Sequence, residues 1–137
     1  MSKKGILIIG AGGVSRVATV KCAMNIDTFE KITLASRTVS KCESMAADIL
    51  KNQGVKIDVA SVDADNVDEL VKLIEKVNPK LVLNVALPYQ DLTIMDACTK
   101  CGVDYVDTAN YEHPDVAQFE YKLQWARDNQ FKEAGIM

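Results

Sequence analysis

The chain has 137 residues, 48% hydrophobic and 26% charged, with a formal net charge of −3, which fits one ordinary globular domain. This charge balance gives no attraction to nucleic acid or an anionic membrane, and no apolar run reaches the roughly 20 residues of a membrane-spanning helix. Met1 leads within a few residues into a predicted strand, without a secretory leader, so we expect a cytoplasmic protein that binds neither nucleic acid nor membrane.

Short strands alternate with helices along the chain. Apolar runs predict strands over residues 5–9, 31–35, 56–62, 81–86 and 103–106. Helical spacing predicts helices over residues 13–25, from about 40 to 52, from 65–68 to 77, 90–101 and 115–130. The first of these helices is expected to bury one apolar face, formed by Val14, Val17, Ala18 and Cys22.

Particular residues mark the predicted helix ends. Ser40 and Glu43 have the spacing of a capping box near the start of the second helix, and Gly54 supplies its stop. Residues 65–68, Asp-Asn-Val-Asp, are typical of the start of the third helix, which should end before Pro79.

Five strand–helix units with short connections predict an α/β fold. We expect a doubly wound parallel sheet of the Rossmann type, with strand order 3-2-1-4-5 and helices on both faces. Residues 134–137 resemble the opening of a sixth strand. We therefore expect residues 1–137 to be an N-terminal dinucleotide-binding domain and a fragment of a longer polypeptide.

A glycine-rich turn lies between the first strand and the first helix. Backbone N–H groups at a helix N-terminus attract anions, and glycine lets a pyrophosphate approach without meeting a Cβ. A serine stands where the third glycine of the G-x-G-x-x-G pattern usually is. We predict a dinucleotide site formed by Gly10, Gly12, Gly13, Val14 and Ser15.

The end of the second strand indicates which nucleotide is bound. NAD-preferring domains place an acid there to accept from the ribose hydroxyls, but Glu30 precedes the strand. The sequence instead has Ser36, Arg37 and Thr38, a cation between two hydroxyls that suits a 2′-phosphate. The alternative is a solvated Arg37 and a capping Thr38. We expect NADP(H) to be favoured over NAD(H).

Ligands of such a sheet lie over the carboxyl ends of the first and fourth strands. We expect Asp63 and Ala64 to border the adenine, where Asp63 would accept from the amine; a loop or capping acid is the equal alternative. Asp107 and Thr108 follow the fifth strand and are further candidates for the nicotinamide side.

The segment after the fourth strand is expected beside the nicotinamide ribose. Its candidate contacts are Asn84, Val85, Ala86 and Leu87. Pro88 fixes an extended turn at this point. Tyr89 would cover the cofactor or touch substrate, or else simply pack against the protein.

Three other patterns favour structural roles. His113, the only histidine, precedes a proline and fits a turn residue better than an acid–base catalyst. The acids of residues 63–69 fit loop and helix N-terminal preferences, so we predict no metal site. Cys98 and Cys101 fall in the last turn of a predicted helix, where the helix dipole disfavours a thiolate.

Four blocks of the sequence, in order, resemble the N-terminal cofactor domain of the saccharopine dehydrogenase-like family. They are residues 10–14, 35–38, 84–89 and 102–112. The similarity covers essentially the whole chain and is most specific in the last block. Within the family it is closest to the carboxynorspermidine (carboxyspermidine) dehydrogenase branch.

This resemblance implies an NADPH-dependent reductive condensation in polyamine biosynthesis. A diamine, 1,3-diaminopropane or putrescine, would form an imine with aspartate semialdehyde, and hydride would reduce it to a secondary amine. The family enzyme continues into a substrate and dimerisation domain. We therefore expect a full-length homodimer and an inactive isolated chain. Tyr89, Asn110, Tyr111 and Glu112 would border substrate, and no catalytic residue is assigned.

Two alternative functions stay open from the sequence. A saccharopine dehydrogenase or reductase of lysine metabolism joins a different aldehyde or keto acid to an amino acid, and its cofactor residues would be the same. A nucleotide-binding module without catalysis, which senses redox state or serves assembly, would also keep the glycine-rich turn.

Overall fold

Five short parallel strands form one sheet in the computed structural model, which describes residues 3–108, 111–116 and 121–137. The strand order is β3-β2-β1-β4-β5, so strands are added on one side of β1 in the first half of the chain and on its other side in the second half, and the predicted doubly wound α/β fold is confirmed. The strands are β1 (Ile6–Ile9), β2 (Ile32–Ser36), β3 (Asp58–Ser61), β4 (Leu81–Asn84) and β5 (Asp104–Asp107).

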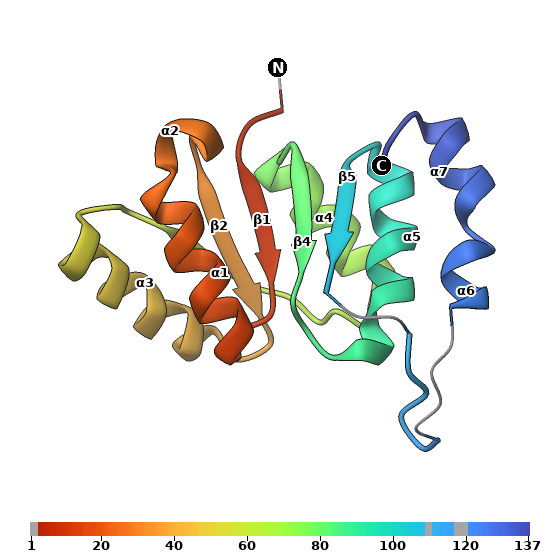
Figure 1. Ribbon diagram of the computed structural model, residues 1–137, viewed down its shortest axis with the longest axis horizontal. Helices are drawn as coiled ribbons and strands as arrows, with labels where there is room; N and C mark the ends of the chain where they lie inside the picture. The colour runs from red at the N-terminus through yellow and green to blue at the C-terminus, as the bar shows by residue number, and fades with distance from the viewer. Residues whose placement is uncertain (1–2, 109–110, 117–120) are drawn as a thin grey trace.

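Helices cover both faces of this sheet (Figure 1). Those of the first half are α1 (Gly13–Met24), α2 (Ile26–Phe29) and α3 (Val39–Gln53). Those of the second half are α4 (Val67–Val77), the short 3-10 helix η1 (Pro88–Gln90), α5 (Asp91–Cys101), α6 (Lys122–Trp125) and α7 (Asp128–Ala134). None of the described helices combines the length and apolar character that crossing a bilayer requires.

Alternation along the strands divides the core into two clusters. Leu7 and Ile9 of β1 pack with α4 and α5 residues such as Ile74 and Ile94. Ile6 and Ile8 pack on the opposite face with α1 and α3 residues. Because all four β1 residues are buried, the central strand is covered on both faces. Its parallel pairing with β2 and β4 places the carboxyl ends of the three strands at one edge of the sheet.

The buried face of α1 differs from the prediction. Val14 and Val17 are each 61% exposed, whereas Ser15, Thr19, Cys22 and Ala23 are buried. The prediction placed the apolar residues of α1 toward the core. The face that packs closely on the sheet consists instead of small residues, polar ones included. The prediction was therefore right for Cys22 and wrong for both valines.

The start of α3 also corrects the prediction. The helix begins at Val39 with Thr38 as N-cap, and no side chain caps it, so Ser40 lies inside the first turn and not at a capping box. Gly54 ends α3 in the left-handed conformation, as predicted. Asn66 caps α4 by accepting from the N–H groups of Asp68 and Glu69, both at 3.1 Å.

Residues 121–137 contain two short helices, α6 and α7, where the end of one long helix was predicted. Of the predicted helix over residues 115–130, residues 117–120 lie outside the described residues, and α7 continues to Ala134. Ala134 is thus helical, where the opening of a sixth strand was expected. The final residue nonetheless lies beside β5, since the Met137 carbonyl accepts from the Tyr105 N–H at 2.7 Å.

Candidate nucleotide-binding site

The turn after β1 is built around Gly10. Its φ of +117° lies outside the region that other residues favour, and its N–H donates to the Ala35 carbonyl at 2.9 Å. A Cβ at this position would lie 2.7 Å from the carbonyl carbon and oxygen of Val85. Gly10 is therefore required by the close approach of the chain that follows β4.

Gly12 and Gly13 serve a different purpose, because a Cβ on either would meet no protein atom within 4 Å. Gly12 is the N-cap of α1, and no side chain caps that helix. The first N–H groups of α1 therefore have no capping side chain, and Gly12 and Gly13 line an open hollow. The partial positive charge of these N–H groups suits an anion that approaches the bare backbone.

Ser15 occupies the position of the third glycine and is completely buried. Its hydroxyl donates to the Gly10 carbonyl oxygen at 2.5 Å. The third glycine normally allows close packing of helix on strand. Here a small polar side chain fits into that contact. Val14, the neighbouring candidate, is exposed on the outer side of α1.

An open cleft of about 290 Å³ lies beside this turn. Its walls come from the ends of β1, β2 and β4 and the segment after β3, the edge where a doubly wound sheet holds its ligands. The lining residues are Ile9, Gly10, Ala11, Gly12, Ser36, Arg37, Thr38, Lys41, Val62, Ala64, Val85, Ala86, Leu87 and Gln90.

Cations gather at the β2 end of the cleft. Arg37 is exposed there, and its side chain makes no hydrogen bond or ion pair within the described ranges. The same holds for Lys41 among the residues with described placement, whereas Arg16 on α1 is paired with Asp48 of α3 at 3.0 Å. Two cations are thus available to a ligand in the cleft.

Sequence reasoning missed Lys41, which also lines the hollow beside Gly12 and Gly13. Lys41 lies in the first turn of α3 and lines the cleft because that helix begins at Val39. The Ser36 hydroxyl donates to the Thr38 carbonyl at 3.0 Å, which stabilises the turn between β2 and α3. Thr38 itself is exposed on the cleft wall.

The residues after β3 divide into one that lines the cleft and one that does not. Ala64 lines it. Asp63 instead accepts from the Asp65 N–H at 3.1 Å, and its own N–H donates to Glu69 at 3.1 Å. These are the bonds of a turn residue, the alternative that the sequence left open. The adenine contact of Asp63 stays a prediction.

The segment after β4 likewise divides. Val85, Ala86 and Leu87 line the cleft, whereas Asn84 is 4% exposed and turned into the protein. Asn84 Oδ1 accepts from the Ala86 N–H at 2.9 Å, which turns the chain and ends β4 two residues before the predicted end. Asn84 shapes the wall that its neighbours form.

The end of β5 lies outside this cleft. Asp107 Oδ2 accepts from the Tyr105 hydroxyl at 2.8 Å and from Gln124 Nε2 at 3.0 Å. Thr108 is exposed. Their contacts with the nicotinamide side stay predictions.

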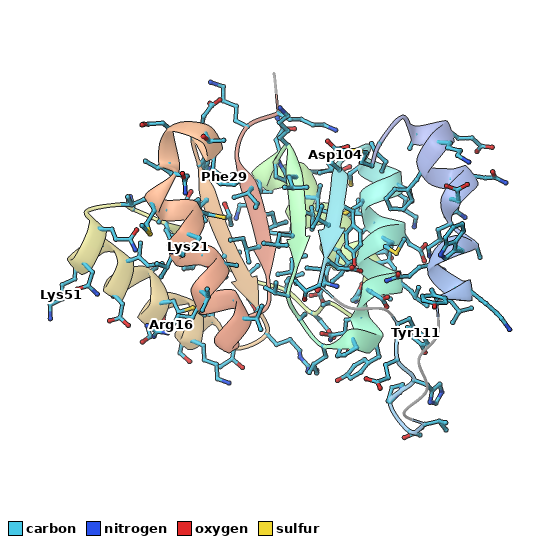
Figure 2. The ribbon with its side chains drawn as sticks, viewed as in Figure 1. Arg16, Lys21, Phe29, Lys51, Asp104 and Tyr111 are labelled. Atoms are coloured by element: carbon cyan, nitrogen blue, oxygen red, sulfur yellow. The ribbon has the colours of Figure 1, made fainter. Side chains whose placement is uncertain are left out.

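A second hollow of about 240 Å³ brings the expected substrate segment together with Tyr89. Its lining residues are Pro88, Tyr89, Glu112, His113 and Pro114. Tyr111 lies in the same segment, at the carboxyl edge of the sheet (Figure 2), and Asn110 lies outside the described residues. His113 Nδ1 accepts from the Asp115 N–H at 3.1 Å, a turn contact.

Cys98 and Cys101 lie in the last turn of α5, as predicted. Cys98 is fully buried, and burial raises the pKa of its thiol well above the ordinary value. Such a thiol is a poor nucleophile. In the described part of the chain, no group of three or more histidine, cysteine or acidic side chains could hold a metal ion.

Comparison with known proteins agrees with this geometry. The model of the family described as saccharopine dehydrogenase NADP binding domain matches residues 6–137. A carboxyaminopropylagmatine dehydrogenase from Synechocystis is 53% identical, over 96% of this chain and 32% of that protein. Carboxynorspermidine synthases from Vibrio alginolyticus and Vibrio cholerae are 43% and 40% identical, over 96% of this chain and 34% of each relative. The chain thus spans about a third of the length of these relatives.

Solved structures share the fold. An apo saccharopine dehydrogenase from Saccharomyces cerevisiae matches with a TM-score of 0.74 at 19% identity, over 98% of this chain and 26% of that one. A putative short chain dehydrogenase from Escherichia coli matches with a TM-score of 0.68 at 14% identity, over 98% of this chain and 78% of that one. At these identities the likeness shows the sheet and its helices alone.

Proposed function

Because the chain belongs to the saccharopine dehydrogenase NADP-binding domain family, we propose that its cleft binds NADP(H) in preference to NAD(H). The observation that carries the preference is the pair of available cations, Arg37 and Lys41, at the β2 end of the cleft. A 2′-phosphate adds two negative charges at this end of the nucleotide, and a guanidinium can hold it with two hydrogen bonds.

The glycine turn supports the position of the rest of the nucleotide. The pyrophosphate would lie over Gly12 and Gly13, against the N–H groups of α1. The ribose and nicotinamide would follow the wall of Val85, Ala86 and Leu87. The cofactor supplies the hydride, and the chain's own contribution is to orient it and to exclude water from one side.

For the whole protein we propose a reductive condensation of a diamine with aspartate semialdehyde. The amine and the aldehyde lose water to form an imine, and hydride from NADPH with one proton gives the secondary amine. The support for a diamine comes from the relatives named carboxynorspermidine synthase, and the relative named carboxyaminopropylagmatine dehydrogenase supports the same class of reaction on an amine. This chain spans only about a third of them, so the substrate-binding groups and the homodimer contact are proposed to lie in a further part of the protein.

The cofactor preference is tested by titrating NADPH and NADH against the chain and three single variants. Arg37→Ala should weaken NADPH by about 1.5–3 kcal/mol, the cost of a charged hydrogen bond, and leave NADH nearly unchanged. Lys51→Ala removes the same charge at the far end of α3 (Figure 2) and should change neither affinity. An equal loss of both nucleotides in Arg37→Ala would refute the clamp.

Lys41→Ala separates two positions for the ammonium group. A loss confined to NADPH places Lys41 on the 2′-phosphate, whereas an equal loss for both nucleotides places it on the pyrophosphate. Turnover is tested by adding 1,3-diaminopropane, aspartate semialdehyde and NADPH to this chain. We expect binding without NADPH oxidation, and measurable amine-dependent oxidation would overturn that expectation.

A further inference from the structure

A chain of buried and partly buried hydrogen bonds runs from the wall of the nucleotide cleft past the end of β5 to α6. It begins at Asn84, whose Oδ1 accepts from the Ala86 N–H at 2.9 Å and whose Nδ2 donates to the Tyr105 hydroxyl at 3.1 Å. Ala86 lines the cleft, whereas Asn84 and Tyr105 are 4% and 9% exposed. The Asn84 amide therefore joins the cleft wall to the protein interior.

The Tyr105 hydroxyl and the Ala86 N–H together determine which way the Asn84 amide faces. A phenol has one proton, and that proton is donated to Asp107 Oδ2 at 2.8 Å. The oxygen of Tyr105 can then only accept, so it selects the NH2 end of Asn84 and leaves Oδ1 for the Ala86 N–H. Burial raises the pKa of Tyr105, which keeps that proton in place.

Asp107 is itself fixed in orientation. Gln124, which belongs to α6, donates from Nε2 to Asp107 at 3.0 Å and to the buried Asp91 at 2.5 Å. Each hydrogen bond in this chain therefore has a defined donor and acceptor. Reversing the Asn84 amide would place its oxygen against the Tyr105 hydroxyl, whose only proton is already donated to Asp107. The Tyr105 hydroxyl, which does not line the cleft, is thus connected to the Ala86 N–H through the two ends of one amide.

We propose that Tyr105 is a positioning residue for the nucleotide: through Asn84 it sets where residues 85–87 lie, and so how well the cleft wall fits a dinucleotide. This inference rests on the proposed nucleotide site. Because the wall would contact a part that NADPH and NADH share, Tyr105 affects affinity for both. That separates it from Arg37, which acts on the 2′-phosphate alone.

The first test is Tyr105→Phe, which removes the hydroxyl and keeps the ring that packs edge-on against Phe131. We expect NADPH and NADH affinities to fall together by roughly fivefold, the worth of one hydrogen bond. Phe131→Leu is the matched control, because it removes the ring contact and leaves the hydroxyl. It should lower stability with unchanged nucleotide affinity. Unchanged affinity in Tyr105→Phe, or an equal loss in Phe131→Leu, overturns the proposal.

A double-mutant cycle tests whether Tyr105 acts through Asn84. Asn84→Leu should weaken both nucleotides, and adding Tyr105→Phe to it should cause no further loss. Additive losses would mean that the hydroxyl acts by another route and would refute the proposal.

Amide hydrogen exchange gives a measurement that needs no nucleotide and no Asn84 variant. In Tyr105→Phe the Ala86 amide should exchange faster, while the Val82 amide inside β4 stays protected. Unchanged Ala86 protection overturns the positioning role. A wild-type chain that binds neither nucleotide would refute the proposed function instead, and the exchange result would still decide the role of Tyr105.

Discussion

The Ser15 hydroxyl donates a hydrogen bond of 2.5 Å to the carbonyl oxygen of Gly10, across the turn that joins β1 to α1. The serine is completely buried, and it stands where glycine is usual. The bond holds the first turn of α1 against the residue whose N–H is anchored to Ala35. The departure from the glycine pattern therefore supplies a contact that glycine could not make.

Replacing Ser15 tests this contact. Ser15→Ala should lower the free energy of unfolding by about 1 kcal/mol, because it removes one hydrogen bond and little volume. Ser15→Val should cost more, about 1–3 kcal/mol, since a larger side chain must fit a fully buried position. Urea denaturation measures both. Ser40→Ala, on the exposed side of α3, is the control and should stay within about 0.5 kcal/mol.

The glycines at positions 10 and 12 should respond in opposite ways to alanine. Gly10→Ala meets the Val85 carbonyl and a φ of +117°, so it should lower the free energy of unfolding by at least about 2 kcal/mol. Gly12→Ala meets nothing and should change stability by less than about 1 kcal/mol. It should nonetheless weaken nucleotide binding by at least about tenfold, because its Cβ occupies space that a pyrophosphate needs.

Denaturation and nucleotide titration of the two variants give the comparison. A Gly12→Ala chain that keeps wild-type affinity would show that the phosphates do not approach this backbone. A Gly10→Ala chain of normal stability would contradict the close approach of the β1 and β4 ends.

The sequence was sufficient for the strand order, because alternating strands and helices with short connections leave few topologies. It was not sufficient for the rotation of α1. Val14 and Val17 looked like core residues, yet Ser15 and Thr19 face the sheet. The rotation is set by how closely the first turn approaches Gly10, and that depends on space and not on hydropathy.

The candidate site shows the same division. The glycine turn and Arg37 follow from local patterns, because each chemical role belongs to adjacent residues. The cofactor contact predicted for Asn84 stays a prediction. Its hydrogen bond to Tyr105, a residue 21 positions away in the chain, was not foreseen. Such long-range pairing has no signature in one sequence. Lys41 was missed because its approach to the cleft depends on where α3 begins.

A two-pronged ion pair attaches the C-terminal helices to α5. Arg127 donates from Nε and Nη2 to the two oxygens of Asp96, at 2.7 and 3.0 Å. Arg127→Lys keeps the charge but cannot form both parallel hydrogen bonds to the carboxylate. We therefore expect the free energy of unfolding to fall by about 1 kcal/mol, after allowing for partial exposure. Faster amide exchange in α7 and unchanged exchange in α3 would locate the loss.

An exposed ion pair within α7 is the control for that prediction. Lys132→Ala breaks the Lys132–Asp128 contact, whose side chains are 70% and 53% exposed, and should cost no more than about 0.5 kcal/mol. A larger loss of stability in Lys132→Ala than in Arg127→Lys would contradict the argument that the Arg127–Asp96 ion pair attaches α7 to α5.

Asp91 lies at the start of α5 with 1% of its surface exposed. Burial raises its pKa, and the Asp107 carboxylate adds to the rise, while hydrogen bonds from Gln124 and the Leu92 N–H oppose it. The folded chain therefore holds this proton more tightly than the unfolded chain does. Stability from Asp91 is fully present below the unfolded pKa and is lost as pH rises through the folded pKa.

Replacing Asp91 should consequently change the pH dependence of stability. Asp91→Asn and Asp91→Ala both remove the titrating group, so the free energy of unfolding of each, relative to wild type, should increase as the pH rises from below 4 towards neutrality. The two variants differ in the hydrogen bond they offer Gln124, which changes the offset between their curves and not the slope. Urea denaturation at a series of pH values measures both. Differences that stay flat or fall with pH would mean that Asp91 carries its charge in the folded protein without cost, because the bonds from Gln124 and Leu92 fully replace its hydration.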